Sequence, residues 1–203
     1  MPIEKSQREK RKWMSTVITF AAASFLLFSC APKKPAPERA FTTMDLLISL
    51  SDMPAGWKII RGPGELKDYF STKDSSWIAF VVSPTGSPGR DGAVHRVYRY
   101  RSANNAREVY EDLIRPGIPG KTPVGWIYQS PVAASSYFAC YDYEGREPYP
   151  VCEYAAHYEE YVVVFHSWLI PDYMSLQDIE RVIKAIDIRM AQYLGKPLPT
   201  QEP

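Results

Sequence analysis

The first thirty residues constrain the fold most, because they place a membrane-directed segment ahead of everything else in the chain. The first twelve residues hold five lysines or arginines and two glutamates, a net charge of +3. From Trp13 to Ser29 there is no charged residue and no proline, and the run is strongly apolar. A basic segment followed by a short apolar one is typical of a secretory signal peptide. We therefore expect residues 1–29 to take no part in the folded domain.

The apolar run ends in Leu27-Phe28-Ser29-Cys30, which resembles the lipobox of bacterial lipoprotein signal peptides. In that family the cysteine thiol carries diacylglycerol and the peptide is cut just before it. The resemblance implies that Cys30 becomes a lipidated N-terminus, and two acyl chains suffice for stable membrane attachment. The protein would then sit in the cell envelope, on the extracytoplasmic side of a membrane. An uncleaved anchor is the alternative, since the seventeen residues 13–29 are at the short end of what spans a bilayer.

Composition divides the rest of the chain into a spacer, one domain and a tail. Residues 30–39 hold three prolines and predict an extended spacer with a reach of roughly 30 Å. Residues 40–193 suffice for a single domain with a core, and residues 194–203 are expected to be a flexible tail. Without residues 1–29 the chain has 19 basic and 21 acidic residues out of the original 24 and 23, so no nucleic-acid partner is indicated.

The two remaining cysteines predict a disulfide. Cys140 and Cys152 lie in segments 137–143 and 151–157, which have the composition of two strands, and a turn about Arg146 would place the thiols opposite each other. An oxidising compartment favours the bond. The eleven residues between the thiols differ from the C-x-x-C spacing of redox enzymes, so a catalytic or metal-binding role is disfavoured.

The remaining pattern predicts an α+β fold with a mostly antiparallel sheet of about six or seven strands, covered by two or three helices. Ser102 and Ser175 are expected helix N-caps, the second with Asp178 in a capping box. Segment 161–168 is apolar on both faces and predicts a central strand covered on both sides. The expected helices are 43–50, 103–114 and 176–193, and the expected strands are 57–60, 76–82, 93–100, 125–128, 136–143, 151–157 and 161–168, with a loop at 84–92.

The motif Pro-x-Gly-Trp occurs twice, at 54–57 and 123–126, each time ahead of predicted strands. The echo has two explanations: a duplicated unit, or chance recurrence in a proline-rich chain. The lipobox, this motif, the antiparallel sheet and the closing helix together resemble the PsbP-like and LpqN-like extracytoplasmic proteins. The resemblance implies a noncatalytic binding or assembly module.

No motif for catalysis, a cofactor or a metal stands out. His95, His157 and His166 lack metal-ligand spacing, there is no G-x-S-x-G, and the glycine-rich stretches lack a phosphate-binding lysine. Glu153 and His166 are expected opposite each other on neighbouring strands, as an acid/base pair or, more simply, as an ordinary cross-strand contact. A hydrolase is therefore the least favoured hypothesis, and we expect no enzyme activity and no cofactor.

The chain contains fourteen tyrosines, and they are the one candidate for a binding surface. Tyr141, on the face that Tyr137 and Tyr143 share, and Tyr149, in the expected hairpin tip, are the candidate residues, although aromatic residues also pack readily within sheets. We therefore expect a noncatalytic envelope module that binds an envelope protein or glycan. The alternative is a carrier or sensor for a small apolar or glycan ligand, which would require a cavity of several hundred Å³.

Overall fold

The computed structural model describes residues 34–66, 72–82, 92–115, 120–142 and 149–198. The chain divides into two units, Met1–Lys34 and Pro35–Pro203, and every element named here belongs to the second. In chain order these elements are η2 (Thr43–Leu46), η3 (Leu50–Asp52), β1 (Lys58–Glu65), β2 (Asp74–Val81), β3 (Gly92–Arg99), α2 (Ala103–Leu113), β4 (Ser135–Tyr141), β5 (Val151–Tyr158), β6 (Tyr161–Trp168) and α3 (Leu176–Leu194).

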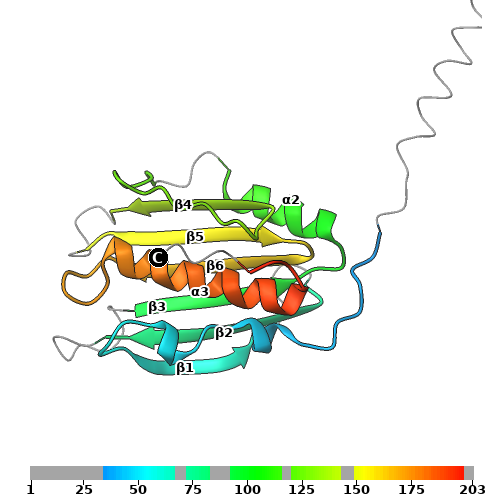
Figure 1. The fold of residues 1–203 in the computed structure, drawn as a ribbon, viewed down its shortest axis with the longest axis horizontal. Coiled ribbons are helices and arrows are strands. Elements are labelled where there is room, and N and C mark those ends of the chain that lie inside the picture. The colour runs from blue at the N-terminus through cyan, green and yellow to red at the C-terminus, as the bar shows by residue number, and fades with distance from the viewer. Residues whose placement is uncertain (1–33, 67–71, 83–91, 116–119, 143–148, 199–203) are drawn as a thin grey trace, which may run out of the picture. The chain divides into compact units, whose positions relative to one another are not determined.

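The six strands form one antiparallel sheet in the order β1-β2-β3-β6-β5-β4 (Figure 1). The chain builds two meanders, β1–β3 and β4–β6, and joins them through the β3–β6 pair at the centre. Strands that follow one another closely in the chain pair antiparallel, which is why the strand spacing in the sequence predicted this arrangement within each meander. The predicted α+β fold is confirmed.

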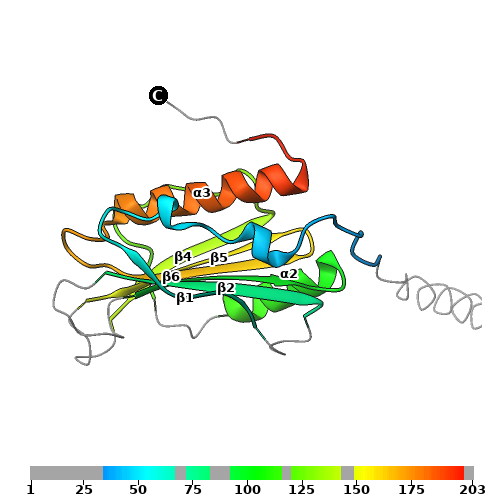
Figure 2. The ribbon, with the colours of Figure 1, turned by 90° about the horizontal axis from the view of Figure 1, so that it is seen from below.

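Helices cover both faces of the sheet (Figure 2). Val163 and Phe165 of β6 belong to the core that α3 and the η2 region cover. Val162 and Val164 point the other way and pack with Tyr110 of α2. Successive residues of a strand face opposite sides, so two apolar faces require two layers of cover. The two-sided cover expected of segment 161–168 is confirmed.

Both long helices begin at the predicted caps. Ser102 Oγ accepts a hydrogen bond from the Asn105 N–H at 3.2 Å, and Ser175 and Asp178 form the expected capping box. Helix α3 ends at Gly195, whose φ of 65° is the left-handed conformation that glycine adopts without strain. Lys196 Nζ donates to the Val132 carbonyl at 3.1 Å, so the packed structure extends into the expected tail. Residues 199–203 of that tail lie outside the described residues.

The expected helix 43–50 is wrong: two short 3-10 helices stand in its place. Each begins with a capping box, Thr42 with Asp45 and Ser49 with Asp52. Leu47 between them is extended, with φ −69° and ψ 140°. Three consecutive apolar residues, 46–48, are all buried. A continuous helix buries only one stripe of its surface, so the extended backbone is what allows the whole run to enter the core.

The expected strand 125–128 is also wrong. Gly125 has a φ of 86°, and the Trp126 N–H donates to the Pro123 carbonyl at 3.2 Å, which closes a turn. Residues 126–133, which follow this turn, belong to no strand and pair with none in the described sheet. The aromatic residues among them instead pack between β4 and α3, so tertiary packing overrides the strand propensity of this segment.

The two Pro-x-Gly-Trp motifs share a turn and little else. Gly56 and Gly125 have φ values of 89° and 86°, and the Trp57 N–H also reaches the Pro54 carbonyl, at 3.5 Å. The first motif leads directly into β1, whereas the second is followed by coil until β4 begins at Ser135. The helical segments before the two motifs also lie on opposite faces of the sheet. In this strand order, a twofold rotation that exchanged the two meanders would leave every element on its own face of the sheet. Because the two helical segments lie on opposite faces, no such rotation relates them, and the echo does not extend to a repeated unit.

Cys140 and Cys152 are direct partners across β4 and β5 and are joined by a disulfide, as predicted. The residues about Arg146 that were expected to form the turn lie outside the described part of the chain, as do Tyr143 and residues 84–91 of the expected loop. In the part that is described, no helix is long and apolar enough to cross a membrane.

The end of the predicted spacer is bound to the domain. The Ala36 N–H donates to the Arg101 carbonyl at 2.7 Å, and Arg99 Nη2 donates to the Pro37 carbonyl at 2.5 Å. Arg39 bonds the side chains of Glu159 and Glu160 at 2.6 and 2.9 Å, in the β5–β6 turn. The folded structure therefore begins before residue 40, and among the described residues its contacts with the domain begin by Ala36.

Candidate functional site

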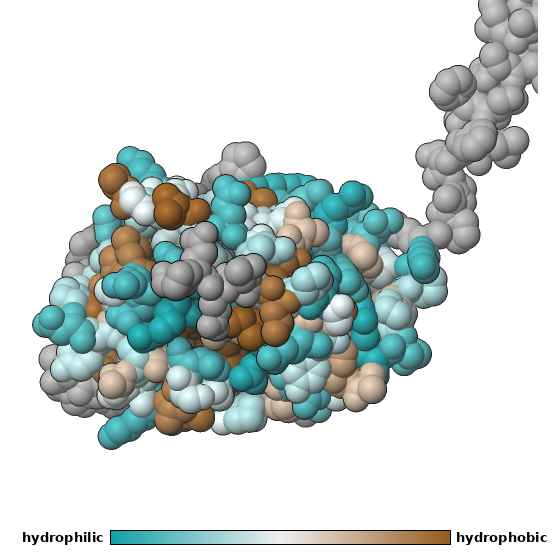
Figure 3. Space-filling model, in the orientation of Figure 1, coloured by the Kyte–Doolittle hydropathy of each residue, from teal (hydrophilic) through white to brown (hydrophobic). Residues whose placement is uncertain are grey.

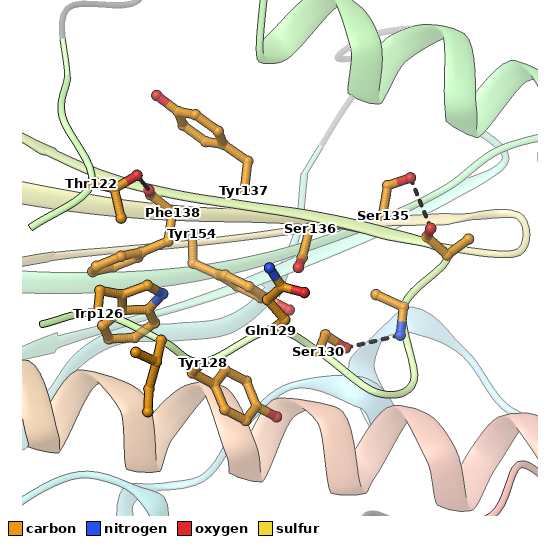
Figure 4. A pocket seen from close by; sticks show the side chains of 13 residues that line it. Thr122, Trp126, Tyr128, Gln129, Ser130, Ser135, Ser136, Tyr137, Phe138 and Tyr154 are labelled. Atoms are coloured by element: carbon orange, nitrogen blue, oxygen red, sulfur yellow. Dashed lines mark hydrogen bonds between the residues drawn. The ribbon is translucent and has the colours of Figure 1, made fainter.

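A pocket of about 570 Å³ lies beside β4, where the coil that precedes this strand passes between β4 and α3 (Figure 4). Five aromatic side chains and a set of hydroxyl and amide groups line it. The lining residues are Thr122, Trp126, Ile127, Tyr128, Gln129, Ser130, Ala133, Ala134, Ser135, Ser136, Tyr137, Phe138 and Tyr154. The volume lies within the range of small-ligand sites, roughly 300–1,000 Å³.

Aromatic residues from three segments meet at the pocket. Phe138 of β4 and Tyr154 of β5 are direct cross-strand partners on the face that α3 covers. The Trp126 ring stacks on Phe138, with centroids 3.8 Å apart and an interplanar angle of 24°. Tyr128 stands edge-on to Trp126 at 6.5 Å and 81°. Tyr137 contributes from the same strand, but its side chain points to the other side of β4 (Figure 4).

Residues 126–134 form the outer wall of the pocket, which we call the wall segment. Ser130 Oγ accepts hydrogen bonds from the Val132 and Ala133 N–H groups at 3.2 and 2.8 Å, so a turn follows. The Ala134 N–H then bonds the His157 carbonyl at 2.8 Å, which delivers the chain to the start of β4. The short-range bonds of Ser130 give the coil a defined path without strand pairing.

Asp187 of α3 holds the wall segment in place. Its carboxylate accepts hydrogen bonds from Tyr128 and Tyr158, both at 2.5 Å, and from Ser130 at 2.7 Å. The side chain is fully buried. Burial raises the pKa of Asp187 above its ordinary value, although the three donors act in the opposite direction. Tyr154 extends the network, since its hydroxyl lies 3.0 Å from that of Tyr158.

This network explains why Asp187 acts as a structural group. Three hydroxyls occupy the carboxylate oxygens, and the residue is sealed from solvent, so it offers no open site to a reacting molecule. Burial also raises the pKa of Tyr128 and of Tyr158, so both stay protonated and remain donors. The network thus supports the pocket from behind rather than supplying an acid or base to it.

The outward edge of β4 is partly occupied by the chain itself. The Cys140 N–H and carbonyl both bond Lys121, each at 3.0 Å. Thr122 Oγ1 donates to the Phe138 carbonyl at 3.2 Å. Backbone groups of alternate residues face the same edge of a strand, so those of Ser136 face outward as those of Phe138 and Cys140 do. Ser136 lies at the pocket. Ser135 and Ser136 are exposed there, as is Gln129 on the wall segment.

The two tyrosines singled out from the sequence are not among the pocket residues. Tyr141 is half-buried on the face of β4 that carries Tyr137, as its position in the strand predicted. Tyr149 is half-buried against the core on the α3 side. The two tyrosines therefore lie on opposite faces of the sheet and do not form one surface.

Glu153 and His166 are direct partners on β5 and β6, as expected. However, the hydrogen bond that His166 makes through Nδ1 is with Arg96 Nη1, at 3.3 Å. Burial and the nearby Arg96 charge lower the pKa of His166 to about 4, and burial raises the pKa of Glu153. His166 therefore stays neutral near pH 7. The contact fits the simpler of the two interpretations, an ordinary cross-strand neighbour.

No family model matches this chain, and no match was found among the curated proteins or the solved structures. The lipobox and PsbP-like resemblances therefore stay predictions. Within the described residues, no group of three His, Cys, Asp or Glu side chains is placed to hold a metal ion.

The sequence contained signals for part of this site. Asp187 interrupts the apolar stripe of Ile183, Ile186 and Met190 on α3, and a carboxylate at that spacing indicates a buried polar contact. The strand expected at 136–143 begins one residue earlier, at Ser135, and Ser135 and Ser136 also line the pocket, a role for which the sequence carried no signal. No local pattern pointed to Trp126 and Tyr128 as pocket residues, since they were expected to form a strand.

Proposed function

We propose that this chain is a noncatalytic binding module of the bacterial cell envelope, anchored by lipid on Cys30, and that its ligand site is the pocket beside β4. The observation that carries the proposal is a cavity of about 570 Å³ with aromatic walls and exposed polar groups. Aromatic faces with a few placed hydroxyls and amides are what small-ligand sites present. The buried Asp187 network supports the pocket as a preformed site, because it holds the wall segment against α3 before any ligand arrives.

A substitution that fills the pocket tests this proposal. Ser136 is exposed and lines the cavity, so Ser136→Trp should occlude it while sparing the core. We expect native mass spectrometry of the full-length protein, extracted mildly from its own membrane, to show a bound small molecule that the variant lacks. The matched control is Ser51→Trp, at an exposed serine of η3 that does not line the pocket. Equal ligand occupancy in the wild type and Ser136→Trp would contradict the pocket as the site.

A partner protein is a second candidate, because apolar side chains stand exposed at the same place. Val124 is 100% and Ile127 86% exposed. Hydrophobic atoms appear at the surface over the coil that precedes β4 (Figure 3). Exposed apolar groups beside a groove are typical of interaction sites. A photoreactive amino acid at position 127 should crosslink one defined partner in intact cells, whereas the same residue at the 40%-exposed Tyr193 should not. Identical adducts at both positions would argue against a specific surface.

A further inference from the structure

We infer that the pocket beside β4 takes an uncharged saccharide, bound with ring faces against Trp126 and Tyr128 and with hydroxyls against Gln129 and Ser136. This inference rests on the proposed function, since it names the ligand class of the same pocket. Four observations carry it: the charge of the lining, the aromatic geometry, the polar groups and the occupied edge of β4.

The lining carries no charged side chain at any of its thirteen positions. The nearest acidic group behind the wall, Asp187, is fully buried and already accepts three hydroxyl donors. Lys184 Nζ sits on Tyr128, 5.4 Å from the ring centroid, and does not line the pocket. An ionised ligand would lose hydration here without gaining a counter-charge. A neutral ligand avoids that cost.

The aromatic rings suit a molecule with an apolar face and a polar rim. Trp126 and Tyr128 are half-buried and nearly perpendicular, at 81°. Phe138 backs Trp126 at 3.8 Å, so the indole is held rigidly. The C–H groups on one face of a pyranose carry small positive charges, and the face of an aromatic ring is negative. A sugar ring can therefore lie against either aromatic side chain.

The exposed polar groups match hydroxyls. Gln129 and Ser136 enter the pocket from the wall segment and from β4 (Figure 4). An amide and a hydroxyl each donate and accept hydrogen bonds, as a sugar hydroxyl does. Neutral donors and acceptors on two sides of a cavity, with aromatic faces beneath, fit the rim and the faces of a sugar ring.

The edge of β4 disfavours a peptide that adds as a strand. Strand addition requires consecutive outward-facing backbone groups. In β4 these belong to residues 136, 138 and 140; Lys121 bonds both backbone groups of residue 140, and Thr122 bonds the carbonyl of residue 138. The edge that is left around Ser136 is a short platform, so a compact ligand suits the site better than an extended chain.

The test uses the full-length protein in a detergent without a sugar headgroup. Three probe classes are titrated by calorimetry and by saturation-transfer NMR: short neutral oligomers of glucose, mannose and N-acetylglucosamine; tetramethylammonium; and a capped, uncharged dipeptide. We expect a neutral oligosaccharide to bind, with saturation transferred to its ring C–H protons. Gln129→Ala should weaken it by about tenfold, since one hydrogen bond and its geometry are lost. Trp126→Ala should abolish it.

The controls separate loss of contact from loss of fold. Gln129 is exposed, so its alanine variant should unfold at the wild-type temperature, whereas Trp126→Ala removes a packed ring. Tyr193→Ala, at an exposed aromatic residue outside the pocket, should leave binding within about twofold.

Two different results would overturn the inference. If only the cation or only the dipeptide binds, and Gln129→Ala or Trp126→Ala weakens it, the saccharide assignment is wrong and the pocket remains a binding site. A cation ligand would also bind more tightly to Gln129→Glu, whereas a neutral sugar would not. If none of the three classes binds in a manner that depends on these residues, both the saccharide assignment and the proposed function fail.

Discussion

His95 of β3 is fully buried, and its Nδ1 accepts a hydrogen bond from the Ile48 N–H at 3.2 Å. Arg189 of α3 binds the same stretch of chain, since its Nη1 donates to the Leu47 carbonyl at 2.6 Å. Burial, with a smaller effect from the Arg189 charge, lowers the pKa of His95 to about 3. The imidazole is therefore neutral in the folded protein at any pH near neutrality, and it acts as an acceptor that anchors residues 46–48.

This residue predicts a pH dependence of stability. The unfolded chain protonates His95 near pH 6.5, whereas the folded protein resists protonation down to about pH 3. Between those values the unfolded state binds more protons, so stability is full above about pH 6.5 and is lost as the pH falls. His95→Gln should be less stable at pH 7. Between about pH 6 and 4, its unfolding free energy should also fall less steeply with pH than that of the wild type, by up to roughly 1.4 kcal/mol per pH unit. Urea unfolding of both proteins across this pH range measures the two slopes. Equal slopes would contradict a lowered pKa for His95 in the folded protein.

The disulfide gives a second prediction at this scale. The Cys140–Cys152 bond closes a loop with a sequence separation of 12 and constrains the unfolded chain. The double variant Cys140→Ser, Cys152→Ser should lose about 3 kcal/mol of unfolding free energy. Chemical denaturation of the wild type with and without a reductant provides the comparison. The reduced wild type should match the double variant, and reductant should leave the variant itself unchanged.

At the scale of elements, Arg39 is one of the groups that bind the N-terminal segment to the end of the sheet, and it does so through buried charge. Arg39 bonds Glu159 and Glu160, and the Glu160 side chain is only 1% exposed, with Arg99 as its other cation at 3.5 Å. Removing Arg39 would leave a buried carboxylate short of a partner. We expect Arg39→Ala to cost about 2 kcal/mol of unfolding free energy and to release residues 36–39 to hydrogen exchange.

A matched control lies beside it. Lys73 pairs with Glu38 at 3.1 Å, but Glu38 is 91% exposed. An ion pair in water contributes little, so Lys73→Ala should change the unfolding free energy by less than about 0.5 kcal/mol. Equal losses in the two variants would mean that burial does not set the strength of the Arg39 contacts.

Helices and strands could be predicted from the sequence where the residue pattern within a segment decides its structure. Strand 161–168 and the helix starting at Ser175 both follow from alternation, periodicity and a cap. Prediction failed at 43–50 and at 125–128, where apolar and aromatic residues fit more than one backbone. There the choice depends on which surface is available to pack against, and that surface is formed by residues distant in the chain.

At the scale of the whole molecule, the spacer sets how far the domain can lie from its proposed anchor. Only residues 31–35 separate Cys30 from Ala36, whose N–H bonds the Arg101 carbonyl. At about 3.1 Å per residue in an extended chain, that is roughly 15 Å, about half the length expected for the whole spacer.

The lipid itself is open to direct measurement. Mass spectrometry of the membrane-extracted protein should find a mature N-terminus at Cys30 carrying diacylglycerol. Cys30→Ala should leave the signal peptide uncut, because the lipidated thiol is what the processing enzyme acts on in the lipoprotein family. A wild-type protein that retains Met1 and an unmodified Cys30 would support the uncleaved anchor instead.

The sequence by itself determined the α+β class, most strand positions, the helix caps and the disulfide partners, because each depends on residues near one another in the chain or on simple register; the envelope address stays a prediction. The tertiary structure alone decided the pocket. The coil at 126–134, β4 and β5 supply most of its lining, and Asp187 of α3 holds the coil in place from behind. Trp126 carries no local signal of its place in the fold; it lines the pocket because its ring stacks on Phe138 of β4. Contacts between distant segments form only when the whole chain folds, and the pocket depends on those contacts.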